Sequence, residues 1–126
     1  MRILIDTHIF IWHLEDDSAL SLARSELIED PSNEILLSIA SLWEISIKLS
    51  IGKLTLSRSI EDVILHINRS TSSFLAIEPE HLVHVASLPF HHKDPFDRLL
   101  ISQSLVEDIP IISSDPNFAE YGVELL

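Results

Sequence analysis

Four acidic residues occupy positions at which a carboxylate is costly to bury. Asp6, Glu44 and Asp115 interrupt or directly follow strongly apolar segments, which read ILIDTHIFIW, IASLWEISIK and IISSD. A fourth acid, Asp97, lies in the run HHKDPFDRLLIS. A carboxylate beside a core strand needs compensation by pairing, hydrogen bonding or a bound cation. Four such acids in one small chain predict a shared compensator, and a divalent metal ion is the simplest candidate.

The remaining candidate ligands favour a hard cation over zinc. The chain has no Cys, so neither a disulfide nor a thiolate zinc site can form. His91, His92 and Asp94 could form a His/Asp metal cluster, but adjacent side chains diverge and the spacing is not that of a zinc motif. We interpret these histidines as part of a solvated loop. Oxygen ligands without Cys or a suitable set of histidines suit Mg²⁺ or Mn²⁺.

Short apolar runs alternate along the chain with longer segments of helical period. We expect strands at residues 2–5, 34–37, 74–77 and 110–113, with an edge strand at 123–125. We expect helices at residues 18–29 with Ser18 as N-cap, from Ser38 or Ser41 to about 50, and at 7–14, 59–69, 79 onward and 95–107. This alternation predicts an α/β fold with a single domain, residues 1–126. Its central, mainly parallel sheet has four to five strands flanked by helices on both faces.

This topology brings the four acids to one edge of the sheet. Asp6 and Asp115 directly follow strands, so both lie at carboxyl ends, where open parallel sheets bind ligands. Asp97 falls in the first turn of its helix, and helix N-termini point to the same edge. Glu44 follows the second strand by about two helical turns at most and can lean over that edge.

Each acid also has a purely structural interpretation. Lys48 lies four residues after Glu44 and can pair with it on the same helix. Asp94 can cap the helix 95–107, with Asp97 favourable in its first turn. Two further acids are suited to start a helix or a turn: Asp6 and Asp115. Caps alone do not explain four acids on one edge.

The charge of the chain restricts the classes of partner. The formal net charge is −12, which argues against a protein that coats nucleic acid through counterion release. An enzyme that contacts nucleic acid through bound metals and a few basic side chains remains compatible, and a basic partner would be attracted. No segment has the pattern of a signal peptide or the length of a membrane span. We therefore expect a soluble cytoplasmic protein with no membrane contact.

Four segments of the chain resemble PIN-domain proteins, most closely the VapC-type ribonuclease toxins of bacterial toxin–antitoxin systems. They are LIDTHIFIW at 4–12, SIASLWEISIK at 38–48 followed by GKL at 52–54, HHKDPFDRLLISQS at 91–104, and PIISSDPNFAEYGV at 110–123. They extend over almost the whole chain in the order of that family. The resemblance implies a PIN-like domain whose active site consists of four acids: Asp6, Glu44, Asp97 and Asp115. Ser113 stands where the family often has Thr.

The resemblance further implies one or two Mg²⁺ or Mn²⁺ ions, frequent homodimers, and a cognate antitoxin that blocks the site. Asp6 and Asp97 would be the principal metal ligands for hydrolysis of RNA phosphodiester bonds. Glu44 and Asp115 would complete the shell. The basic residues nearest the motifs are candidate contacts to RNA phosphates: Lys48, Lys53, Arg58 and Arg98. We interpret Trp43 as a core residue rather than a base-stacking platform.

Three alternatives remain open for these acids. A metal-dependent phosphohydrolase of small molecules would use the same set. A receiver-like signalling domain also gathers acids at the edge of a parallel sheet, but it would have paired acids after the first strand and a Lys after a late strand. Here Asp6 stands alone and the late strand ends in Asp115. A non-catalytic family member acting as a protein-binding module would not need all four acids.

Overall fold

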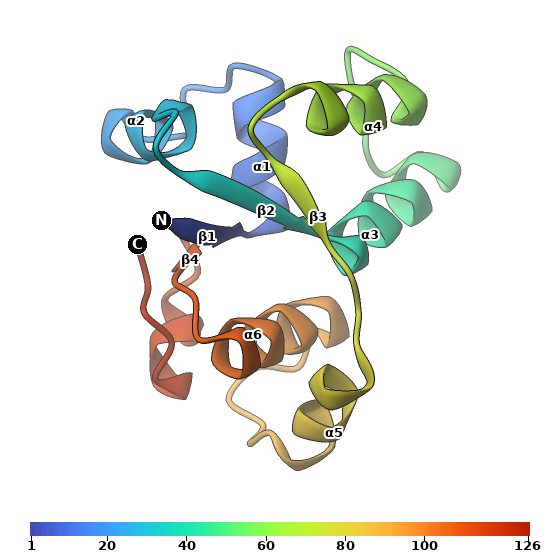
Figure 1. The fold of residues 1–126 in the computed structure, drawn as a ribbon. Coiled ribbons are helices and arrows are strands. Elements are labelled where there is room, and N and C mark those ends of the chain that lie inside the picture. The colour runs from blue at the N-terminus through green and yellow to red at the C-terminus, as the bar shows by residue number, and fades with distance from the viewer.

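Four short parallel strands form the centre of the molecule, and helices cover both faces of their sheet (Figure 1). The computed structural model describes all of residues 1–126. The strands are β1 (Arg2–Ile5), β2 (Glu34–Ser38), β3 (Ser73–Leu75) and β4 (Ile111–Ile112). The helices are α1 (Thr7–Leu14), α2 (Leu22–Glu29), α3 (Ile39–Ser50), α4 (Ile60–Arg69), α5 (Pro79–Ser87), α6 (Pro95–Glu107) and the 3-10 helix η1 (Pro116–Tyr121). The predicted α/β fold with a parallel sheet is confirmed. None of the helices is long and apolar enough to cross a membrane.

The sheet has the strand order β3-β2-β1-β4, and all of its pairings are parallel. Because β1 is central, Leu4 aligns with Leu36 on one side and with Ile111 on the other. The expected edge strand at 123–125 is wrong, since Leu125 forms just one parallel bridge, to Ile111. Because β4 contains two residues, it offers the C-terminal segment too few partners for a longer pairing.

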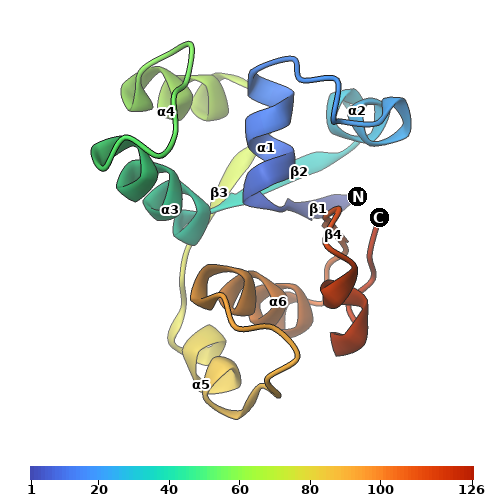
Figure 2. The ribbon, with the colours of Figure 1, turned by 180° about the vertical axis from the view of Figure 1, so that it is seen from behind.

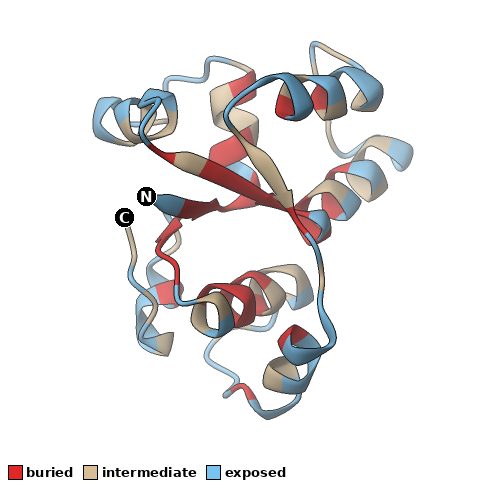
Figure 3. Cartoon of the chain, viewed as in Figure 1, coloured by how far each residue is buried: buried red, intermediate tan, exposed pale blue.

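Alternate residues of β1 face two separate apolar cores. Ile3 and Ile5 belong to the core that α1, α3 and α4 cover, whereas Leu4 belongs to the core under α6 and η1. Figures 1 and 2 show these two groups of helices on opposite faces of the sheet, and Figure 3 shows β1, β2 and β4 largely buried between them, with β3 less so. Burial on both faces is typical of parallel strands, and it fixes the strand ends that carry the acids.

The two helices that carry candidate ligands begin at well-formed caps. Ser38 caps α3, and its Oγ accepts the backbone N–H of Ala40 at 3.0 Å. Asp94 caps α6, and its Oδ1 accepts the N–H groups of Phe96 at 2.8 Å and Asp97 at 3.1 Å. The predicted start of α6 is confirmed, and Ser38 rather than Ser41 is the start of α3. These caps satisfy otherwise unpaired backbone donors and so determine where the acids of both helices lie.

One predicted helix start is wrong. The helix expected from Ser18 begins at Leu22, and its N-cap is Ser21. Asp17 accounts for the difference, because its Oδ1 accepts the backbone N–H of Ala19 at 2.9 Å. An Asp that bonds the backbone two residues ahead stabilises a turn in competition with a helix.

Candidate active site

Asp6 directly follows β1 and is 3% exposed. Its Oδ2 accepts a hydrogen bond of 2.7 Å from the hydroxyl of Ser113, which follows β4. Its Oδ1 is buried without any partner, and the side chain caps no backbone group of α1. Burial is the main cause that raises the pKa of Asp6 above its ordinary value, against the lowering effect of the Ser113 hydrogen bond. Asp6 thus occupies the N-cap position of α1, as predicted, but its side chain forms no capping hydrogen bond, and the fold leaves one of its oxygens unsatisfied.

Glu44 lies in the second turn of α3 and is 4% exposed. Its Oε2 lies 3.0 Å from the Nζ atom of Lys48, so the predicted pair within the helix forms. Its Oε1 is buried and has no hydrogen-bond partner. The ion pair consequently satisfies one oxygen of the Glu44 carboxylate and leaves the other oxygen available to a ligand.

Asp97 lies in the first turn of α6 and has the most perturbed carboxyl of the site. Burial, followed by the negative charges of Asp6 and Asp94, raises the pKa of Asp97 from 3.8 to about 7, and His92 acts in the opposite direction. The charge of Glu44 contributes a further, smaller increase. Since Asp94 caps α6, the side chain of Asp97 is not needed to start the helix. Asp6, Glu44 and Asp94 therefore lie near enough to Asp97 to act on the charge of its carboxyl.

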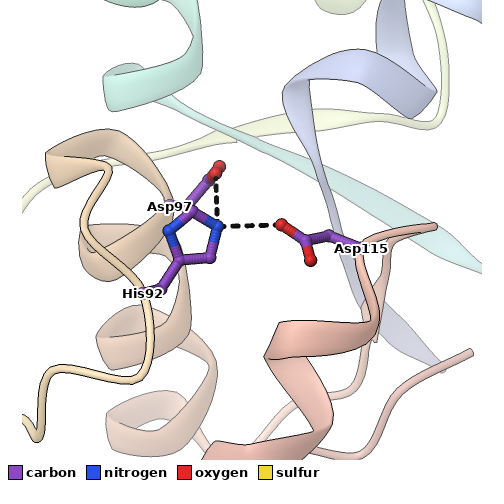
Figure 4. Close-up of side chains that lie close together, drawn as sticks. All are labelled: His92, Asp97 and Asp115. Atoms are coloured by element: carbon purple, nitrogen blue, oxygen red, sulfur yellow. Dashed lines mark hydrogen bonds and ion pairs between the residues drawn. The ribbon is translucent and has the colours of Figure 1, made fainter.

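Asp115 follows β4 and has two roles. Its Oδ1 accepts the backbone N–H of Asn117 at 2.9 Å, which caps η1. Its Oδ2 lies 2.8 Å from Nε2 of His92, and the same nitrogen lies 3.1 Å from Oδ2 of Asp97 (Figure 4). The predicted turn-starting role of Asp115 and its position beside Asp97 therefore coexist.

The interpretation of His92 as part of a solvated loop is wrong for its side chain. Its backbone lies in the loop before α6, as predicted, but the side chain is 13% exposed and turns inward between two acids (Figure 4). His91 instead points away and lies 3.5 Å from Glu120 with about half of its surface exposed. The signal in the sequence was the position of His92 two residues before the helix cap Asp94, which places its ring over the start of α6.

Two further expectations about side chains need correction. Trp43 is not a core residue: it is 59% exposed, and its ring meets that of Phe96 edge-on at 5.2 Å between centroids. Arg98 is 6% exposed, and its guanidinium donates to the carbonyl oxygens of Pro89 at 2.8 Å and Leu88 at 3.0 Å. The guanidinium of Arg98 is thus buried and hydrogen-bonded within the fold, which corrects the expectation that Arg98 contacts RNA.

The other candidate RNA contacts lie at different places. Lys48 is paired with the acid cluster through Glu44, and Lys53 is exposed in the loop after α3. Arg58 lines an open pocket together with His66 and Arg69 of α4, and none of the four acids borders this pocket. Of the basic residues singled out from the sequence, Lys48 is the one in direct contact with the acids.

The acid cluster fits a divalent cation. Buried polar atoms in proteins nearly always have partners, yet Asp6 and Glu44 each contribute one buried oxygen that has none. Ligand atoms of His92, Asp97 and Asp115 lie within 4.8 Å of one another. Buried carboxylate oxygens that lack donors, beside a carboxyl whose pKa is raised by burial and by neighbouring acids, are what Mg²⁺ or Mn²⁺ would satisfy.

Comparisons with known proteins agree with this fold. The solved structure of VapBC2 from Rickettsia felis bound to a promoter DNA fragment is similar, with a TM-score of 0.74 and 16% identity over 100% of this chain and 98% of that chain. VapBC-1 from nontypeable Haemophilus influenzae is similar with a TM-score of 0.71 and 16% identity, over 100% of this chain and 97% of that chain. A toxin–antitoxin complex from Klebsiella pneumoniae is similar with a TM-score of 0.63 and 15% identity, over 98% of this chain and 95% of that chain. No curated protein matches the sequence significantly.

These identities are low, so the structural similarity establishes the fold alone. The sequence itself matches the family model of the PIN domain over residues 3–124. This match covers almost all of the 126 residues. The chain therefore belongs to the PIN domain family.

Proposed function

We propose that the protein is a metal-dependent endoribonuclease, and that it is the toxin of a toxin–antitoxin pair. The observation that carries the proposal is the pair of buried carboxylate oxygens, on Asp6 and Glu44, that have no hydrogen-bond partner, near the perturbed carboxyl of Asp97. Membership of the PIN domain family supports nuclease chemistry at such a site.

Asp6 and Asp97 would be the principal ligands of Mg²⁺ or Mn²⁺, and Glu44 and Asp115 would complete the shell directly or through water. A bound ion of this kind lowers the pKa of water and offsets negative charge on a phosphodiester. The protein itself fixes the ligands: the Ser113 hydroxyl holds one oxygen of Asp6 at 2.7 Å. Asp97 must lose its proton to bind a cation, because burial and neighbouring acids raise its pKa to about 7.

An exposed aromatic residue, Trp43, favours a nucleic-acid strand over a small phosphate ester. Trp43 directly precedes Glu44, and Phe96 directly precedes Asp97. The T-shaped pair of Trp43 and Phe96 joins α3 and α6, the two helices that carry Glu44 and Asp97, and leaves Trp43 exposed to a passing base. Exposed aromatic rings stack on bases irrespective of sequence. Lys48 in α3 and Lys53 in the loop after α3 are the candidate phosphate contacts.

A cognate antitoxin and a second copy of the chain are the proposed protein partners. The similar structures from R. felis and K. pneumoniae are complexes of the toxin–antitoxin class, which supports an antitoxin for this chain. The formal charge of −12 would attract a basic segment of such a partner. The enzyme would act on RNA in the cytoplasm.

Induced expression of the wild type beside Asp97→Asn tests the proposal. We expect growth arrest with RNA cleavage for the wild type and neither for the variant at equal amounts of folded protein. The purified proteins should be compared on RNA and on a panel of phosphomonoesters with Mn²⁺. Cleavage of phosphomonoesters alone would support the small-molecule alternative, and equal behaviour of both folded proteins would contradict a catalytic role for the acids.

A further inference from the structure

We propose that His92 is a positioning residue of the metal site, which orients Asp115 by a hydrogen bond from Nε2 and stays outside the ligand shell. This inference rests on the proposed function, because it requires that these acids bind a divalent cation. His92 lies in the cluster with both acids, so direct coordination by its ring is the obvious competing interpretation. The hydrogen bonds of the ring decide between the two.

The backbone of Asp94 determines which ring nitrogen of His92 carries the proton. The N–H of Asp94 donates to Nδ1 of His92 at 3.1 Å. A backbone amide can donate but cannot accept through its N–H, so Nδ1 must present its lone pair. In the neutral ring the proton then resides on Nε2. A protonated Nε2 has no lone pair for a metal ion, and it faces Asp115 at 2.8 Å and Asp97 at 3.1 Å as a donor.

The surroundings of His92 also resist rotation of the ring. Its backbone N–H donates to the hydroxyl of Tyr121 at 2.8 Å, and that hydroxyl donates to the carbonyl of Pro89 at 2.7 Å. The imidazole packs edge-on against Phe118, with 5.9 Å between the ring centroids. Direct coordination through Nε2 would require the loss of the Asp94 hydrogen bond. Donation from Nε2 to a ligating carboxylate requires no rearrangement of these contacts.

Such a donor would act as an outer-shell group of the metal site. Hydrogen bonds to ligating carboxylates fix the orientation of the ligands, and removing them typically weakens metal binding by about 10- to 100-fold. The shorter contact of His92 is with Asp115. We therefore infer that the Nε2–H of His92 stays hydrogen-bonded to Asp115 when the cation binds. Asp97 would then give up its contact with this N–H and bind the cation instead.

The test is Mn²⁺ binding by calorimetry and pulsed electron paramagnetic resonance, which detects a directly coordinated imidazole nitrogen. We expect His92→Ala to bind Mn²⁺ about 10- to 100-fold more weakly than the wild type. His92→Gln, which keeps an N–H donor, should recover most of this loss. The matched control His91→Ala should bind like the wild type, because His91 points away toward Glu120. The nitrogen signals of the wild type and His92→Gln should not differ.

Two results would overturn the inference. A coordinated-imidazole signal that is present in the wild type and lost in His92→Gln would identify His92 as a ligand. Equal or tighter Mn²⁺ binding by His92→Ala would show that the ring merely fills the site. If the wild type cleaves RNA with Mn²⁺ but His92→Ala binds the ion normally, only this inference fails. If the wild type and Asp97→Asn both lack a specific Mn²⁺ site, the proposed function fails with it.

Discussion

Asp97→Asn should stabilise the metal-free protein in a manner that depends on pH. Burial and the charges of Asp6 and Asp94 raise the pKa of Asp97 in the folded protein from 3.8 to about 7. Folding therefore takes up a proton between these values, and the free energy of unfolding falls as the pH rises through this range. The penalty is complete above pH 7 and absent well below pH 4. It corresponds to at most about 4 kcal/mol.

Partial access of water to the carboxyl reduces this figure, and we expect roughly 2 kcal/mol at pH 8. About half of that should remain at pH 5.5, because the unfolded chain is already ionised there. The amide introduced by Asp97→Asn carries no charge at either pH and retains an oxygen that can accept from His92. The assay is urea unfolding of both proteins at pH 5.5 and 8 with a chelator present.

Glu26→Gln is the matched control, because it removes one negative charge from an exposed position on α2. Its effect on stability should be small and nearly independent of pH. Adding Mn²⁺ at pH 8 should stabilise the wild type more than Asp97→Asn, since a cation that binds the folded state shifts the equilibrium toward it. A stability gain from Asp97→Asn that matches the control, or that does not widen between pH 5.5 and 8, would refute the reasoning.

Three further outcomes are expected. The affinity of the wild type for Mn²⁺, measured by calorimetry, should rise close to 10-fold per pH unit below pH 7 and level off above it. The reason is that Asp97 must lose its proton before it binds the ion. An affinity that does not change with pH would exclude Asp97 as a ligand. Lys48→Met should lower the stability of the metal-free protein by about 1–2 kcal/mol in urea unfolding and tighten Mn²⁺ binding, because it removes the cation 3.0 Å from Glu44; Lys53→Met, at an exposed position, should do neither. Trp43→Ala in the Asp97→Asn background should weaken single-stranded RNA binding by about 10-fold in fluorescence anisotropy, and binding equal to the parent would exclude Trp43 from the RNA path.

The elements that position the site were predictable because their signals are local. The apolar run at 2–5 followed by a helical period at 7–14 identifies β1 and α1 within a residue. The Asp94-Pro95 start of α6 is equally local, since the cap and the groups it satisfies lie within three residues. Correct strand ends and helix starts then placed Asp6 directly after β1, Asp115 shortly after β4, and Asp97 in the first turn of α6.

The contacts that the sequence did not predict join residues far apart in the chain. The hydrogen bond between Asp6 and Ser113 spans 107 residues, and His92 reaches Asp115 across a loop, a helix and a strand. The exposure of Trp43 was not predictable for a similar reason. Its helix is apolar on nearly every side, so periodicity could not identify which side lacks a covering element. Arg98 shows the converse case, a charged residue buried because nearby carbonyls accept from it.

The distribution of hydrogen bonds within the cluster favours the proposed ligand site over a structural network. Ser113 satisfies one oxygen of Asp6 and Lys48 satisfies one oxygen of Glu44, while the second oxygen of each carboxylate is buried without a partner. His92 likewise contacts one oxygen of Asp97. A network selected for stability would satisfy both oxygens, because an unpartnered buried acceptor costs about 1–3 kcal/mol. A carboxylate that is held through one oxygen is well oriented, but its second, unpartnered oxygen destabilises the fold. A cation that binds the unpartnered oxygens would offset this loss of stability.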